Sequence, residues 1–238
     1  MKSKSTEKPI RPAALLTELR RTFNDSAEPG RAPKMQAYMK SEMPFHGVPA
    51  TMCKQIYRSC FADLDFDNGA DWQAAVLHLW RHAKFREERY AAIALCEAKA
   101  AKAFQTPDAL PMHEEMIVTG AWWDFVDWIA SHCLGKLIER HPDEIRPKML
   151  EWSRCDNMWK RRSSIICQIS LKKKTDLKLL YACIEPSLDS REFFLRKAIG
   201  WALRQYGWTN PEEVRRYVRQ KGSALSPLSQ REALKNIG

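Results

Sequence analysis

Apolar residues recur at three- and four-residue spacing along nearly the whole chain, and this periodicity constrains the fold most. The segment 12–23 is an example, because it opens with Pro12 and then places its apolar residues on one helical face. Alternating patterns typical of strands are scarce. Further helices are expected at 49–63, 70–83, 86–104, 121–140, 143–153, 157–171, 176–186, 190–207, 210–220 and 227–237. The sequence therefore predicts an all-α protein.

Three of these segments share an order of residue types: bulky or basic, then small, then aliphatic. They are 89–95, 160–166 and 195–201. Aligning them puts Tyr90, Arg162 and Lys197 in register, separated by 72 and 35 residues, and Val126 or Asp127 falls at the missing step. A period near 36 residues with two helices per repeat is typical of an α-solenoid superhelix. We expect the residues in register to lie along one curved surface.

The length and the first residues bear on domain organisation. A chain of 238 residues suffices for one domain or one repeat array. Residues 1–10 are basic and polar without a following apolar stretch, so we expect a disordered lead-in rather than a secretory signal, and one repeat domain over 11–238. No apolar run approaches the roughly 20 residues that cross a bilayer. We expect a cytoplasmic protein without a membrane partner.

The charge balance favours a polyanionic partner. Lysine and arginine number 39 against 29 aspartate and glutamate, which gives a net charge of +10 and an isoelectric point near 9.3. Cations that neutralise phosphates release condensed counterions, so such an excess favours nucleic acid binding. Many basic proteins bind no nucleic acid, however, and the signal taken alone is modest.

Metal and cofactor motifs are missing from the sequence. None of the seven cysteines belongs to a CxxC pair, and most lie in apolar helical stretches, where cysteine acts as a small hydrophobe. His78 and His82 are the only histidines four residues apart, and no carboxylate is near them. No Walker-type, HExxH or GxSxG motif occurs. We therefore expect no disulfide, no metal and no cofactor.

Two segments carry residues unusual for a plain solenoid. Trp123 and Asp127 are four residues apart and share one helix face, although a core tryptophan beside a solvated aspartate is the commoner explanation. Lys160, Arg161 and Arg162 spread around the helix predicted at 157–171, so at most two of them face a ligand. The register favours Arg162. The run at 172–174 fits a solvated, capped helix end as well as a nucleic acid contact.

A third segment, 192–204, places Lys197, Trp201 and Arg204 in one stripe: cation, indole, cation. An aromatic ring flanked by cations suits stacking or cation–π contact beside a phosphate backbone. A core tryptophan with flanking cations whose charged ends reach solvent fits the segment equally well.

The motifs at 122–127, 156–162 and 193–204, with the block at 227–233, closely resemble bacterial DNA alkylation-repair glycosylases with HEAT-like repeats. The likeness runs from about Ala37 to Leu234, and the motifs agree in their order. One departure is Pro49, which follows Gly47-Val48 where the family often carries a polar residue. That difference concerns a contact near the lesion.

The resemblance implies excision of N3- or N7-alkylated purines, such as 3-methyladenine and 7-methylguanine, from double-stranded DNA. Nothing in the sequence points to a lyase step, so we expect a monofunctional enzyme, and a monomer is the default for a protein that reads one duplex. It implies that Asp127, Trp123 and Trp201 form the catalytic cleft, that Arg162 contacts the DNA backbone, and that Tyr38 lies near the lesion. Lys197 and Arg204 are further candidate DNA contacts from the stripe.

The expected residue types suit this chemistry. An alkylated purine is cationic and leaves readily, and the sugar becomes oxocarbenium-like, which a carboxylate stabilises. Two alternatives stay open. A DNA-binding HEAT-like protein without catalysis would keep the cations but lose the aspartate or a tryptophan, whereas a protein-binding scaffold would need neither the stripe nor the charge of +10.

Overall fold

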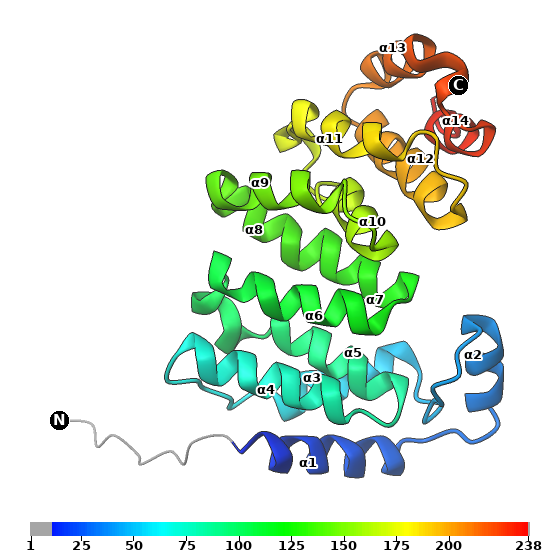
Figure 1. Cartoon of the computed structure of the whole chain (residues 1–238). Helices are drawn as coiled ribbons and strands as arrows, with labels where there is room; N and C mark the ends of the chain where they lie inside the picture. Colours follow the sequence, from blue (N-terminus) through cyan, green and yellow to red (C-terminus); the bar gives the residue numbers. More distant parts are fainter. Residues whose placement is uncertain (1–10, 238) are drawn as a thin grey trace. The chain divides into compact units, whose positions relative to one another are not determined.

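The computed structural model describes residues 11–237, and the expected lead-in at 1–10 lies outside them. All regular structure in this part of the chain is helical, which confirms the predicted all-α class. The chain divides into two compact units, one ending at Phe104 and one beginning at Gln105. In each unit the helices follow one another in chain order, as in an α-solenoid (Figure 1).

The first unit has five α-helices and one 3-10 turn. They are α1 (Pro12–Asp25), α2 (Ala32–Met39), α3 (Ala50–Cys60), α4 (Gly69–His82), α5 (Arg86–Cys96) and η1 (Lys99–Phe104). Helices α1, α3, α4 and α5 pack on one another. The core of this unit includes Leu19, Phe23, Trp72 and Leu79, each fully buried.

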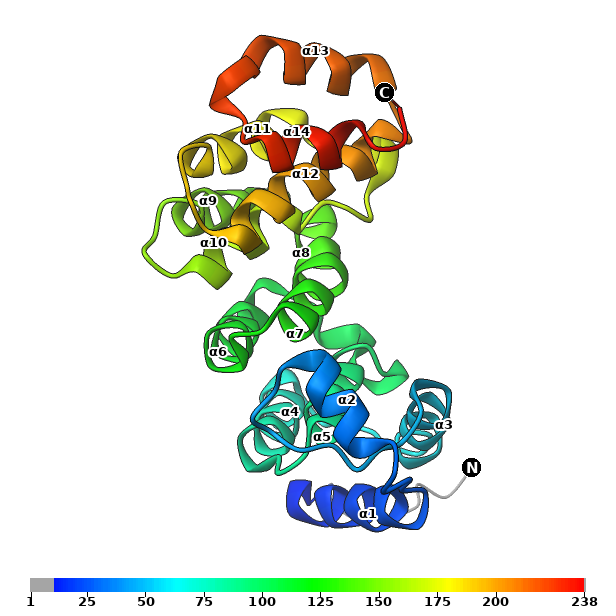
Figure 2. The same ribbon diagram turned by 90° about the vertical axis from the view of Figure 1, so that its right-hand side faces the viewer.

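The second unit carries nine α-helices and several short turns. They are η2 (Pro107–Ala109), α6 (Leu110–Gly120), α7 (Trp123–Trp128), η3 (Ile129–Leu134), α8 (Gly135–Arg140), α9 (Pro142–Trp152), α10 (Met158–Ile166), η4 (Lys172–Lys174), α11 (Leu177–Ile184), η5 (Glu185–Ser187), α12 (Phe193–Gly207), α13 (Pro211–Lys221), η6 (Gly222–Ala224) and α14 (Pro227–Leu234). Helix α12 packs against both α10 and α14, and Figure 2 shows α14 beside α12.

The sequence of α12 explains which face it buries. Leu195, Ile199 and Leu203 recur every four residues and are buried, and burial of one such side chain contributes about 1.5–3 kcal/mol to stability. Lys197 and Trp201 follow these apolar residues by two positions, so they fall on another face of the helix. The apolar stripe thus holds α12 in place while leaving the polar stripe to line a cleft.

Helix boundaries differ from the sequence expectation at several places. The helix expected at 86–104 ends at Cys96, and Lys99–Phe104 forms a separate 3-10 turn. The helix expected at 157–171 ends at Ile166, and Lys172–Lys174 forms a separate 3-10 turn, so these lysines do not end the same helix. Helices α2 and α6 were not expected. Both have a proline in the first turn, and the apolar residues of α6 fall in two runs, 110–112 and 116–118, which give little amphipathic pattern to detect.

The helix expected at 121–140 is one continuous helical run over Trp123–Arg140, but its middle turn, η3, is π-helical. A π-helical turn changes the angular position of the residues that follow it, and such turns are common at functional sites. None of the helices between residues 11 and 237 combines the length and apolar composition that crossing a bilayer requires.

Candidate functional site

Three helices of the second unit bring the predicted site residues together. A hollow of about 380 Å³ lies between α7, α10 and α12 and is bounded by α14. It is lined by Trp123, Asp127, Arg162, Phe193, Phe194, Lys197, Trp201, Arg204 and Glu232. Of the two residues that the register offered at the missing step, Asp127 lines the hollow with Arg162 and Lys197, whereas Val126 is buried.

The floor of the hollow is an ion pair between α7 and α10. The Nε of Arg162 donates to Oδ1 of Asp127 at 2.7 Å, and its Nη2 donates to Oδ2 at 2.8 Å. Its Nη1 donates to the carbonyl oxygen of Phe194 at 2.5 Å. This guanidinium is thus bound on three sides, and Arg162 is only 4% exposed. A bidentate pair of this kind fixes the orientation of the carboxylate.

The burial of Asp127 has an electrostatic consequence. Burial raises the pKa of this carboxyl above its ordinary value, and the nearby Asp124 raises it further, while the Arg162 guanidinium lowers it. Burial outweighs the pairing. Asp127 is therefore a carboxylate held in a fixed position with little solvent around it, and charges that develop beside such a group are stabilised strongly.

Two tryptophans flank this carboxylate. Trp123 precedes Asp127 by one turn of α7, Trp201 lies on α12, and both are half-buried. Trp122 has another role, because its ring packs with Trp159 at 6.4 Å and with Phe194 at 5.8 Å between centroids. This aromatic cluster supports the hollow from behind, while Trp123 and Trp201 keep surface available to a ligand.

Lys197 and Arg204 lie on the same side of α12 as Trp201, and the predicted stripe is confirmed as a geometric feature. Both cations are paired with Glu232 of α14. Its Oε1 lies 2.9 Å from Nζ of Lys197, and its Oε2 accepts from Nη1 of Arg204 at 2.5 Å. The hydrogen bond from Lys197 and the two positive charges lower the pKa of Glu232, so the group is ionised at neutral pH.

A second hollow, of about 480 Å³, shares Trp123, Asp127 and Trp201 with the first. Trp128 and His132 line it and stack on each other, with centroids 4.5 Å apart and planes inclined by 9°. They are four residues apart across the start of the π-helical turn. The sequence analysis did not identify this aromatic pair, because one tryptophan and one histidine at helical spacing usually belong to a core.

Lys160, Arg161 and Lys174, which the sequence also offered as cations, form ion pairs or hydrogen bonds outside the hollow. Lys160 pairs with Glu114 at 2.5 Å, and Arg161 donates to the Ser187 hydroxyl and the Pro186 carbonyl. Lys174 of η4 pairs with Glu139 at 2.6 Å. Tyr38 lies on α2 in the first unit, where it is 79% exposed.

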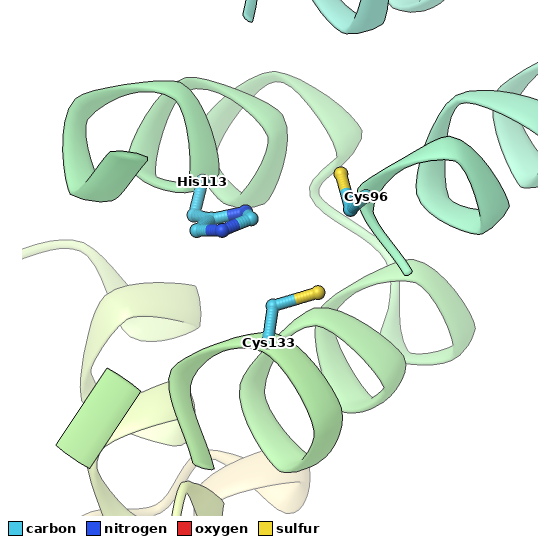
Figure 3. A group of neighbouring side chains, drawn as sticks. All are labelled: Cys96, His113 and Cys133. Atoms are coloured by element: carbon cyan, nitrogen blue, oxygen red, sulfur yellow. The ribbon is translucent and has the colours of Figure 1, made fainter. Parts of the chain in front are cut away.

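Figure 3 labels two buried side chains of the second unit, His113 of α6 and Cys133 of η3, together with Cys96 of the first unit. One ligand atom of His113 lies within 4.8 Å of the Cys133 sulfur. Both ring nitrogens of His113 lack a hydrogen-bond partner among the described residues, and burial lowers the pKa of His113 to about 4. His113 and Cys133 provide two ligands, fewer than the four of a structural zinc site. The expectation of no metal stays a prediction.

Residues 19–237 match the model of the family described as DNA alkylation repair enzyme. The chain belongs to this family. Among solved structures, a protein described as a predicted DNA alkylation repair enzyme from Enterococcus faecalis is similar, with 30% sequence identity and a TM-score of 0.71. The match covers 90% of this chain and 97% of that one. No curated protein matches the chain. Membership of a DNA alkylation repair family supports a role in alkylation repair with DNA as substrate.

Proposed function

We propose that the protein is a DNA glycosylase that hydrolyses the N-glycosidic bond of cationic N3- or N7-alkylated purines in double-stranded DNA, 3-methyladenine and 7-methylguanine among them. The observation that carries this proposal is a largely buried carboxylate, Asp127, whose side chain is 15% exposed and which a bidentate arginine holds between two half-buried tryptophans. Family membership and the net positive charge of the chain support DNA as the partner.

The reaction needs stabilisation of positive charge more than it needs an acid. A purine alkylated at N3 or N7 already carries a positive charge, so its C1′–N bond breaks without further protonation. As it breaks, positive charge develops on the sugar, and the Asp127 carboxylate stabilises that charge and accepts a hydrogen bond from the attacking water. The water oxygen bonds to C1′ and its proton passes by way of Asp127 to solvent, while the purine leaves as a neutral base with the electron pair of the C1′–N bond.

Trp123 and Trp201 would bind the deoxyribose and the cationic nucleotide by CH–π and cation–π contact. Lys197 and Arg204 are proposed to bind backbone phosphates beside Trp201, and Tyr38 to approach the lesion from the first unit. These residues position the nucleotide, and they need neither metal nor cofactor for the step at C1′.

For Arg162 the geometry suggests a role beyond the predicted backbone contact. Three of its five N–H donors, one on each nitrogen, bond to Asp127 and to the Phe194 carbonyl, so its main effect would be to keep Asp127 ionised and aimed into the hollow. A backbone phosphate could share this guanidinium only at its edge. Arg162 would then contribute to catalysis chiefly through Asp127.

The test is release of 7-methylguanine and 3-methyladenine from alkylated duplex DNA, measured in single turnovers without added metal. We expect release by the wild type and a fall of about 10²–10³-fold in Asp127→Asn, because a charge-stabilising group of this kind contributes that much. Duplex binding should be retained. Asp143→Asn, the same change at an exposed position on α9, is the matched control.

Two results would count against the proposal. If the wild type binds duplex DNA but releases neither base, the alternative of a DNA-binding protein without catalysis is correct. If binding depends little on salt, the protein-scaffold alternative gains, because phosphate neutralisation by several cations makes DNA affinity fall steeply with salt.

A further inference from the structure

Glu232 is a carboxylate at the edge of the hollow, beside the cations Lys197 and Arg204. It bonds Lys197 with one oxygen and Arg204 with the other, so two positive charges and one negative charge surround Trp201. A phosphate-binding face would gain affinity without this carboxylate, since it competes with phosphate for both cations. Its presence therefore calls for another explanation.

The main chain holds Glu232 in place independently of these ion pairs. A Cβ at Gly200 of α12 would lie 2.4 Å from Cβ of Glu232 and 2.9 Å from the Ser229 carbonyl oxygen, so only glycine allows α14 to approach so closely. The Ser229 hydroxyl also donates to the Arg196 carbonyl oxygen at 2.9 Å. Ser226 caps the first turn of α14 by accepting from the Ser229 amide.

The arrangement around Trp201 resolves a conflict between its two cations. Lys197 and Arg204 are long side chains with many rotamers, and like charges held near one another repel. One rigid carboxylate that accepts from both removes the repulsion and restricts both side chains. The side-chain exposures are 37% for Lys197 and 20% for Arg204, so both remain accessible to DNA.

We propose that Glu232 is a positioning residue of the DNA site, which holds Lys197 and Arg204 in fixed places on either side of Trp201 and lowers DNA affinity in exchange for catalytic geometry. The expected effect of Glu232 on the excision rate rests on the proposed function. Its expected effect on DNA affinity follows only from the charges of Glu232, Lys197 and Arg204.

The test compares Glu232→Gln with the wild type in two measurements. In binding to unmodified duplex DNA, the variant removes one negative charge, so the net charge of the site rises by one. The slope of log K against log salt should then steepen by about 0.9, with tighter binding at low salt. In single-turnover excision at saturating enzyme, the rate should fall about tenfold to a hundredfold, as small misplacements cause losses of this size.

These opposite signs distinguish positioning from simple support of α14. Loss of α14 packing would weaken binding and slow excision together, and that result would overturn the proposal, as would binding and excision both unchanged. Glu232→Asp keeps the charge and should keep the wild-type salt slope. Glu212→Gln makes the same change of net charge on α13, at an exposed position outside both hollows, and should alter neither quantity.

A failure of the glycosylase proposal can be distinguished from a failure of the proposal for Glu232. If the wild type releases no base, the glycosylase proposal fails, and the binding measurement still decides whether Glu232 restrains the two cations. In that case Lys197→Gln should weaken DNA binding more in the Glu232→Gln background than in the wild type. Equal losses in the two backgrounds would refute the restraint.

Discussion

Each unit contains a cluster in which an arginine pairs with a carboxylate: Arg20 with Glu88 in the first unit and Arg162 with Asp127 in the second. The two clusters differ in what else surrounds the carboxylate oxygens. In the first unit, Glu87 accepts from the amides of His46, Gly47 and Val48 at 3.0–3.2 Å. Glu88 accepts from Arg20 at 3.0 Å and from the Lys84 amide at 2.7 Å.

Both glutamates of the first unit are fully buried, whereas Asp127 in the second unit borders two hollows. The hydrogen bonds to Glu87 hold a turn at Gly47. This position requires glycine, because its φ is +86° and a Cβ there would lie 2.3 Å from the Glu28 carbonyl oxygen. A buried carboxylate enclosed by backbone amides and an arginine thus supports the fold. Asp127 is bound by arginine on one side and borders a tryptophan-lined hollow on the other, so its carboxylate is available for chemistry.

The pKa values of Glu88 and Asp127 are shifted in opposite directions. Burial raises the pKa of Glu88, but hydrogen bonds from His46 and Arg20 and from the Lys84 amide outweigh burial and hold the pKa to about 2. The pKa of Asp127 is shifted upward instead, because burial outweighs its one guanidinium partner. The first cluster is therefore optimised for the ionised form, and the second is not.

The largest expected effect tests the structural role of the first cluster. Arg20→Met leaves the Glu88 carboxylate buried without its cation, which should destabilise the protein by about 3–5 kcal/mol in denaturant unfolding. Excision measured where the variant is folded should be unchanged. Arg21→Met removes an exposed i,i+4 pair and should cost less than about 1 kcal/mol. Comparable losses in the two variants would contradict the distinction between the clusters.

A second prediction concerns a buried group that has no charge partner at all. The folded state holds the pKa of His113 at about 4, below the ordinary 6.5, so the unfolded state binds an extra proton between these pH values. Stability should be unaffected above pH 6.5 and should fall by about 3 kcal/mol as the pH drops to 4.

His113→Met should remove that part of the pH dependence in denaturant unfolding, whatever its stability at pH 7. The loss attributable to Glu88 lies in a separate window, between its ordinary pKa of 4.5 and its folded value of about 2. An unchanged slope between pH 6.5 and 4 in the variant would show that His113 is not the titrating group.

A smaller effect tests the functional cluster. Arg162→Lys keeps a positive charge but loses the fork that holds both Asp127 oxygens, so we expect excision to fall about 10- to 100-fold. Excision requires the ionised carboxylate, so its rate falls as the pH drops through the raised pKa of Asp127. That acid limb should move to higher pH in the variant, because the guanidinium lowers this pKa. A slower rate with an unmoved limb would indicate a phosphate contact instead.

Particular elements show what sequence signals predict and where they fail. Helix α13 was located closely because Asn210 caps it, Pro211 opens it and acidic residues fill its first turn. Helix α10 is shorter than expected, since its apolar pattern continues past Ile166 into a turn whose first residue, Cys167, is also buried. Apolar spacing reports burial, and it does not distinguish a helix from a buried loop.

The order of residues was enough to predict the all-α class, the register of Arg162 and Lys197 with either Val126 or Asp127, and the shared helix face of Trp123 and Asp127. These features depend on spacing within a helix or on a repeat, so they are written in the order of residues. Only the packing of the helices shows that Arg162 forms an ion pair with Asp127 and that Glu232 forms ion pairs with Lys197 and Arg204. Both contacts join helices about 30 residues apart in the chain, and their geometry depends on how closely the helices pack, as Gly200 allows for α14.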